Sequence, residues 1–81
     1  MVREPCEYSI HGRIERVGAR EFVVLVTITC TDQPGPGASF IEEGKARSRE
    51  AAARCLWEMV RSISARLRAQ GNTVVNVETD A

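Results

Sequence analysis

Residues 48–71 read SREAAARCLWEMVRSISARLRAQG, and the apolar positions within this segment recur at intervals of three and four. This spacing is typical of an amphipathic helix, which buries one face and exposes the other. The expected buried ridge consists of Ala52, Leu56, Met59, Ile63 and Leu67, with Val60 on its flank. The segment therefore predicts one long helix over about 49–70.

Both ends of this helix carry stop and start signals. Ser48 is a suitable N-cap, because its hydroxyl can accept a hydrogen bond from a free backbone N–H of the first turn. Glu50 lies favourably in that turn, and Gly71 follows the last helical position. About 22 residues give a rod of roughly 33 Å, close to the length of a nine-residue strand. The helix is therefore long enough to cover a sheet.

Two strands are predicted upstream of the helix. Apolar and polar residues alternate from Cys6 to Glu15, and the segment from Phe22 to Cys30 is rich in β-branched residues. Gly18 lies between the two segments, which favours a hairpin. The side chains expected to face the helix all occupy even positions: Cys6, Tyr8, Ile10, Gly12, Ile14, Phe22, Val24, Val26, Ile28 and Cys30.

The register of this hairpin depends on the length of its loop. A three-residue loop over 17–19 would place Ile14 opposite Phe22. The same register would bring Cys6 opposite Cys30. A slip by one residue is excluded, since it would turn the apolar side of one strand to water. A loop of five residues is the open alternative.

The remaining segments complete an α+β fold. A turn-rich loop from Thr31 to Gly37 precedes a third strand over Ala38 to Lys45, and a closing strand covers Asn72 to Glu78. The predicted fold is a two-layer sandwich of order β-β-β-α-β. One long helix covers one face of a mainly antiparallel sheet of three to four strands. We expect the sheet order 3-2-1-4, with the last strand parallel to the first.

Length and charge bound the class of protein. With 81 residues there is room for one domain, so we expect 1–81 to fold as a unit with tails at 1–5 and 79–81. The 11 basic and 11 acidic side chains cancel, which disfavours a dedicated nucleic-acid binder. Ten of the basic residues are Arg, which we attribute to a GC-rich bacterial genome.

The start of the chain lacks the apolar segment of a signal peptide. The longest apolar run, Phe22 to Val26, is too short to cross a bilayer. We therefore expect a cytoplasmic protein that does not engage a membrane.

The residues able to carry chemistry are few. His11, the single histidine, lies on the face of the first strand opposite to Cys6, so the two cannot form a nucleophile–base pair. Ser9 shares its face with His11 but has no evident carboxylate to orient the imidazole. Cys6, Cys30 and Cys55 could converge if the predicted register holds and Cys55 lies at the edge of the buried helix face, yet a fourth zinc ligand and a C-x-x-C pair are missing. We therefore expect no enzymatic activity, no cofactor and no metal.

The outer side of the sheet carries the most informative anomaly. Val23 and Leu25 lie opposite the expected core side, and we expect Val74 to join them. Apolar residues clustered on an exposed sheet face either mark contact with a partner or reflect only the β propensity of residues on a half-exposed sheet. Trp57 lies at the border of the buried helix face, where it either covers the sheet edge or docks a partner. The leading hypothesis is a non-enzymatic protein-interaction module that binds itself as a homodimer, or another protein, through these residues.

A second hypothesis concerns the basic side chains of the helix. Arg54, Arg61 and Arg68 recur every seven residues and form a stripe opposite the apolar face. Glu50 and Glu58 lie four residues before and after Arg54, where they are placed to pair with it. The stripe is either a solvated, ion-paired helix face or an anion-binding surface.

The helix opens with the run Gly44-Lys45-Ala46-Arg47-Ser48-Arg49-Glu50-Ala51-Ala52-Ala53. With the strands before it, the segment from Phe22 to Val60, about half of the chain, resembles the later part of double-stranded-RNA-binding domains. In those domains a strand pair leads into a Gly-x-Gly-x-Ser-Lys-Lys-like start of an Ala-rich helix. The resemblance implies phosphate contacts by Lys45, Arg47 and Arg49. The alternative function is therefore nucleic-acid or anion binding by Lys45, Arg47, Arg49, Arg54, Arg61 and Arg68.

Overall fold

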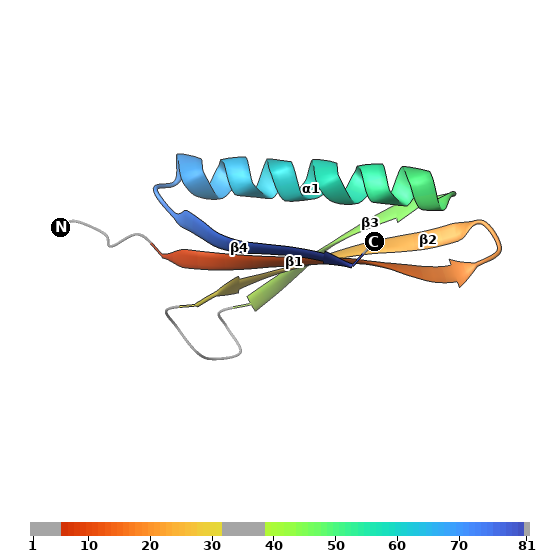
Figure 1. Cartoon of the computed structure of the whole chain (residues 1–81), viewed down its shortest axis with the longest axis horizontal. Helices are drawn as coiled ribbons and strands as arrows, with labels where there is room; N and C mark the ends of the chain where they lie inside the picture. The colour runs from red at the N-terminus through yellow and green to blue at the C-terminus, as the bar shows by residue number, and fades with distance from the viewer. Residues whose placement is uncertain (1–5, 32–38, 81) are drawn as a thin grey trace.

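The computed structural model of the chain describes residues 6–31 and 39–80. In chain order these residues form β1 (Glu7–Gly18), β2 (Glu21–Cys30), β3 (Ser39–Ala46), α1 (Arg49–Ala69) and β4 (Thr73–Asp80). The strands build one mixed sheet of order β3-β2-β1-β4, and α1 lies across one face of it (Figure 1). The predicted α+β class, strand order and parallel pairing of β4 with β1 are confirmed.

Two predictions concern segments that the structure describes only in part. The tail expected at 1–5 lies outside the described residues, as does all but the first residue of the loop expected from Thr31 to Gly37. The third strand is found at Ser39–Ala46, one residue later than predicted.

The ends of α1 form as the sequence predicts. The Ser48 hydroxyl accepts a hydrogen bond from the Ala51 N–H at 3.1 Å. At the other end Gly71 adopts a left-handed φ of 84°, which a residue with a side chain disfavours. The Gly71 N–H donates to the Arg68 carbonyl at 3.0 Å, and the Asn72 N–H donates to the Leu67 carbonyl at 2.9 Å. These two bonds form a Schellman motif, which ends the helix and turns the chain into β4.

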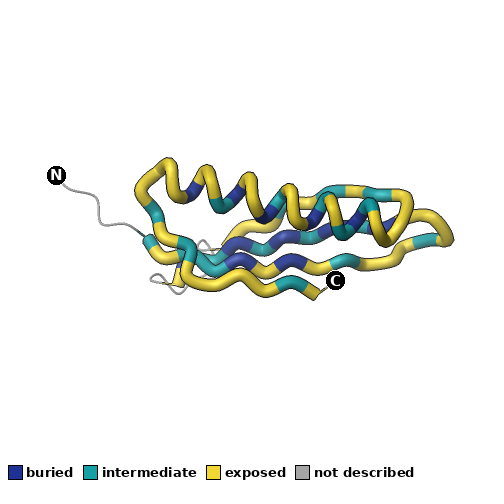
Figure 2. Tube along the Cα trace, turned by 45° about the horizontal axis from the view of Figure 1, so that its top comes forward, coloured by how far each residue is buried: buried dark blue, intermediate teal, exposed yellow. Residues whose placement is uncertain are grey.

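The core lies between α1 and the two central strands. Buried positions alternate along β1 and β2 and recur on the inner side of α1 (Figure 2). The fully enclosed side chains are Ile10, Val24, Val26, Ile28, Ala52 and Leu56. The expected helix ridge is corrected at one point: Val60 is 5% exposed and belongs to the core, whereas Met59 is only partly buried against it. Met59 lies over Gly44 of the edge strand β3, so one of its sides stays open.

The hairpin register differs from the prediction by two residues. Arg16 pairs with Phe22, Gly12 with Val26 and Tyr8 with Cys30. This is the register of the five-residue alternative, not that of the three-residue loop. The pairing shifts after Arg16, whose Nε donates to the Gly18 carbonyl at 3.1 Å. Because the difference is two residues, the predicted alternation of inward and outward side chains is confirmed.

Strand β4 contains a bulge, and it differs from the prediction at two points. Tyr8 pairs with Val74 but Ser9 pairs with Asn76, so Val75 has no partner of its own on β1. Val74 packs against the core on the helix side, and therefore does not lie with the outer residues where we expected it. The strand also continues to Asp80, so residues 79 and 80 belong to the sheet and not to a tail.

Two glycines let the helix approach the sheet closely. A Cβ atom on Gly12 would collide with Leu56 Cδ1. A Cβ atom on Gly44 would lie 3.0 Å from Cys55 Sγ and 3.1 Å from Met59 Sδ. The absence of a side chain at these two positions therefore lets α1 lie close to β1 and to β3.

We expect Gly12→Ala to lower the free energy of unfolding by about 1–3 kcal/mol, because the added methyl group must displace Leu56. Leu56→Ala alone should cost about 2–5 kcal/mol. In the double variant the loss should be smaller than the sum, since the shorter side chain leaves room for the methyl group. Urea unfolding of all four proteins measures this coupling.

Gly18→Ala is the matched control for this experiment. A Cβ atom there would make only ordinary contacts, 3.4–3.6 Å from Glu21. An additive loss in the Gly12→Ala/Leu56→Ala variant would contradict the close approach of α1 to β1.

Candidate interaction surfaces

The face of the sheet that turns away from α1, here called the outer face, consists of the odd-numbered residues of β1, β2 and β3. Val23 and Leu25 lie half-buried at its centre on β2, as predicted. Ile41 of β3 pairs with Thr27, is 64% exposed and lies diagonally next to Leu25. Val23, Leu25 and Ile41 form what we call the apolar stripe. Within the described chain, α1 covers only the opposite face (Figure 1), so the stripe is open.

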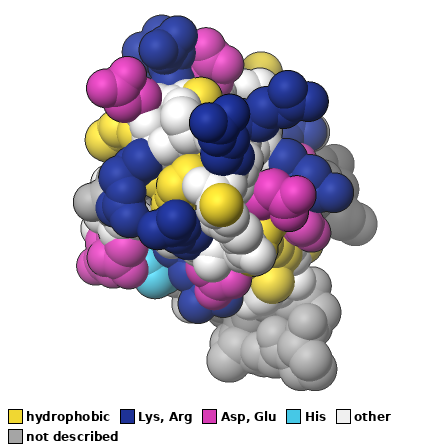
Figure 3. All heavy atoms as spheres, turned by 90° about the vertical axis from the view of Figure 1, so that its right-hand side faces the viewer, with side chains coloured by type: hydrophobic (Ala, Val, Ile, Leu, Met, Phe, Trp, Pro, Cys, Tyr) yellow, Lys and Arg dark blue, Asp and Glu magenta, His cyan; other side chains and the backbone are white. Residues whose placement is uncertain are grey.

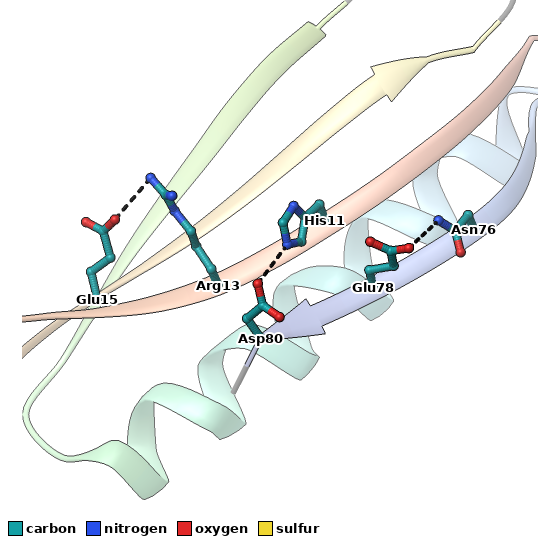
Figure 4. Close-up of polar contacts among 6 residues, drawn as sticks. All are labelled: His11, Arg13, Glu15, Asn76, Glu78 and Asp80. Carbon is teal, nitrogen blue, oxygen red and sulfur yellow. Dashed lines mark hydrogen bonds and ion pairs between the residues drawn. The ribbon is translucent and has the colours of Figure 1, made fainter.

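Charged residues border the apolar stripe on both sides. On β3, Glu43 lies opposite Leu25 and Lys45 lies opposite Val23. On β1, Arg13 lies opposite Leu25 and Glu15 opposite Val23. Arg13 and Glu15 form an ion pair at 3.0 Å (Figure 4). Each border therefore carries one acidic and one basic side chain.

His11 also lies on the outer face, beside a carboxylate that sequence reasoning missed. Its Nε2 is 3.2 Å from Oδ2 of Asp80 on β4 (Figure 4). The histidine and aspartate side chains are 49% and 79% exposed, so water screens the pair. Ser9 is on the same face, but among the described residues no hydrogen bond joins its hydroxyl to His11. The geometry thus supplies an orienting carboxylate without a nucleophile in contact with the imidazole.

Cys55 does not lie near Cys30, so the three cysteines do not form one cluster. Cys30 pairs with Tyr8, and not with Cys6. Cys55 lies beside Gly44, which pairs with Val24 near the other end of β2. The residues that the structure describes contain no group of three His, Cys, Asp or Glu side chains able to hold a metal ion.

The candidate anion contacts separate into two groups on different faces. Lys45 and Arg47 line an open hollow of about 540 Å³ at the hairpin end, together with Glu21 and Glu43. Figure 3 looks onto this end and shows Lys and Arg side chains around a small apolar patch, with acidic side chains nearby. This hollow therefore carries both signs of charge.

The second group belongs to α1 itself. Arg49 begins the helix, and Arg54, Arg61 and Arg68 follow along its exposed surface. The expected pairing of Arg54 with Glu50 and Glu58 is not found: of the ion pairs between described residues, none includes these three side chains. Of the three contacts that the resemblance to double-stranded-RNA-binding domains implies, Lys45 lies on the outer face of β3, whereas Arg49 begins α1 on the other side of the sheet.

Trp57 is 52% exposed, which leaves half of its surface open to a partner. It borders a shallow hollow of about 400 Å³ on α1, lined by Val60, Arg61, Ser64, Ala65 and Arg68. Sequence reasoning placed Trp57 at the border of the buried face, and the structure confirms that position.

Comparisons of the chain with protein-family models, with curated proteins and with solved structures find no match. The resemblance to double-stranded-RNA-binding domains thus rests on the quoted residues alone. Within residues 6–31 and 39–80, no helix combines the length and apolarity that a membrane span requires.

Mild oxidation of the folded protein should yield no disulfide between Cys30 and Cys55. Cys55 lies beside the Val24–Gly44 pair, and six residues of strand, about 20 Å, separate Val24 from Cys30. A disulfide needs Cα atoms within about 7 Å of each other. Peptide mapping by mass spectrometry tests this, and an internal Cys30–Cys55 bond would show that the placement of α1 along β2 is wrong.

Proposed function

We propose that this chain is a non-enzymatic interaction module that forms a homodimer through the outer face of its sheet. The open apolar stripe is the main support for the proposal: Val23, Leu25 and Ile41 are apolar residues that the chain's own helix does not cover. An apolar centre with charged borders is the usual composition of a protein–protein interface.

The size of the outer face fits a dimer of moderate affinity. Four strands about 4.8 Å apart and about 33 Å long offer roughly 600 Å² per copy. Two copies would bury about 1,200 Å², the lower end of the range for specific interfaces. We therefore expect dissociation in the micromolar range.

A two-fold axis gives this face a partner of matching chemistry. The proposed two-fold axis is parallel to the sheet and perpendicular to the strands. It passes between two sets of paired residues, the set that contains Leu25 and the set that contains Val23. The two β2 strands then cross face to face, and Leu25 packs on the partner's Val23. Packed sheets keep their strands within about 30° of each other, which displaces residues near the axis only slightly.

The same axis places opposite charges against each other at both borders. Glu43 lies over the partner's Lys45, and Arg13 lies over the partner's Glu15. Each contact occurs twice, because a two-fold interface is self-complementary. Phosphate binding needs a surface of one sign, so this alternation favours a second copy of the chain over a nucleic acid.

Charge reversal on β3 tests the arrangement. Glu43→Lys should raise the dimer Kd about tenfold or more, because lysine then faces the partner's Lys45 twice. Lys45→Glu should do the same, and the double variant Glu43→Lys/Lys45→Glu should restore wild-type association. Sedimentation velocity across micromolar concentrations measures the Kd. Glu58→Lys on α1 is the control for altered net charge, and a double variant as weak as either single one would contradict the two-fold geometry.

Leu25→Glu tests the apolar centre. It should raise the Kd at least about 100-fold, because two copies of Leu25 lose about 1.5 kcal/mol or more of burial each. Leu25→Lys should have the same effect, since either charge removes the apolar contact. Circular dichroism verifies that both variants fold.

A wild-type chain that sediments at its monomer mass of 8.9 kDa throughout this range would exclude the homodimer. A salt-sensitive gel shift with duplex RNA or DNA would instead support the nucleic-acid alternative.

A further inference from the structure

The free edge of β4 is a second open surface of the molecule. β4 ends the sheet order, so in the described part of the chain no strand pairs with its side away from β1. Val75 and Val77 of this strand are 50% and 41% exposed. Val77 pairs with the buried Ile10 and thus lies on the helix side of the sheet. An open edge with exposed β-branched residues is a template for an additional strand.

The hollow beside Trp57 lies on the side of α1 that faces β4. Arg66, which binds Glu42 at 2.9 Å, marks the side of α1 that faces β3. Trp57 precedes Arg66 by nine residues, which places it about 180° around the helix at 100° per residue. Arg68 follows Met59 by nine residues and therefore lies about 180° around the helix from it. Met59 lies on the β3 side, next to Gly44. Trp57 and Arg68 therefore face the β4 side of the molecule.

The acidic side chains of β4 do not lie on this side of the sheet: Glu78 pairs with His11 and Asp80 with Arg13, so both carboxylates belong to the outer face. Between described residues, neither Arg61 nor Arg68 forms an ion pair within 4.0 Å. The opposite edge of the sheet differs, because the Arg66–Glu42 ion pair crosses from α1 to β3. Among the described residues, an aromatic ring, two guanidinium groups without an ion pair and an open strand edge thus occur together on the β4 side of the molecule.

We propose that the β4 edge, together with Trp57, Arg61 and Arg68, binds an extended acidic peptide segment of a partner protein. The peptide adds to the sheet as a strand beside β4, where backbone hydrogen bonds supply affinity and alternate side chains reach α1. This site is independent of the proposed homodimer, which uses the opposite face.

The spacing on α1 defines the peptide. Arg61 and Arg68 are about 10.5 Å apart along the helix. Two same-face positions of a strand separated by four residues are about 13 Å apart, within reach of the long arginine side chains. Trp57 lies about 6 Å beyond Arg61, one same-face position further. The expected motif is acidic-x-x-x-acidic-x-aromatic, with threonine or valine between.

Two other occupants fit this surface less well. A nucleic acid cannot form hydrogen bonds of the sheet type with the free N–H and C=O groups of β4. A second copy paired edge to edge would bring its own Arg61 and Arg68 against the same arginines, which repels. An acidic peptide satisfies both the backbone and the charge.

The test uses a short synthetic peptide with this motif and a control peptide with Gln in place of Glu. Trp57 is the single tryptophan, so its fluorescence reports binding at this site. We expect a saturable change, new protection of β4 amides against hydrogen exchange, and at least tenfold weaker binding of the Gln peptide. No fluorescence change, or a change without β4 protection, would overturn the proposal.

Charge reversal makes the test specific. Arg61→Glu/Arg68→Glu should abolish binding of the acidic peptide and confer binding of a Lys-containing analogue. Arg20→Glu, an exposed site in the hairpin turn, is the matched control and should bind normally. Leu25→Glu should also bind normally, so failure of the dimer and failure of this site are separate results. Single-stranded and duplex RNA are tested in the same way. If RNA changes the fluorescence of Trp57 and the peptide does not, the surface binds nucleic acid and the proposal is wrong.

Discussion

The contact between α1 and the glycines beneath it governs the layout of this molecule. Leu56 packs directly on Gly12 of β1, and Cys55 and Met59 pack on Gly44 of β3, because neither glycine has a side chain. The helix therefore lies close enough to enclose Ile10, Val24 and Val26 completely. This dry layer contains nearly all of the buried apolar side chains of residues 6–31 and 39–80, and it is therefore the main source of their stability.

One helix cannot cover four strands. An α-helix with its side chains is about 10 Å wide, whereas four strands span about 14–19 Å. The central strands are thus covered, while Phe40 on β3 and Val77 on β4 remain 48% and 41% exposed on the helix side. The outer face is not covered by α1 at all. The surfaces available for partners follow from this mismatch between the widths of the two layers.

Local patterns predicted the parts of the fold that local physics sets. The caps at Ser48 and Gly71 and the even-numbered inward positions of β1 and β2 depend only on neighbouring residues and the period of the strand. Val23 and Leu25 were recognised as outer residues for the same reason. Periodicity cannot detect a shift of two residues, since alternation is unchanged, so the hairpin register was wrong.

Bulges and lateral placement lay beyond sequence reasoning. The extra residue Val75 reverses the alternation of β4 in the residues that follow it, which places Asp80 on the outer face beside His11. Val60, and not Met59, is buried in the core because of the position of α1 across the sheet. The spacing of apolar residues along the helix does not define that position. Ile41 could have been predicted as an outer residue. Neighbouring residues of a strand point to opposite faces, so Phe40 and Ile41 cannot both face the helix, and Ile41 is the one that pairs with the outer residue Thr27.

The balanced net charge gains meaning once the register is known. In a chain with equal numbers of acidic and basic residues, the two kinds of charge can be mixed evenly over the surface or form ordered patterns on particular faces. Here the outer face alternates Glu43 with Lys45 and Arg13 with Glu15, while Arg61 and Arg68 on the other layer have no carboxylate partner among the described residues. The first arrangement is the basis of the proposed homodimer, and the second is the basis of the proposed binding of an acidic peptide. Because α1 and the outer face lie on opposite sides of the sheet, a dimer formed through one leaves the other free.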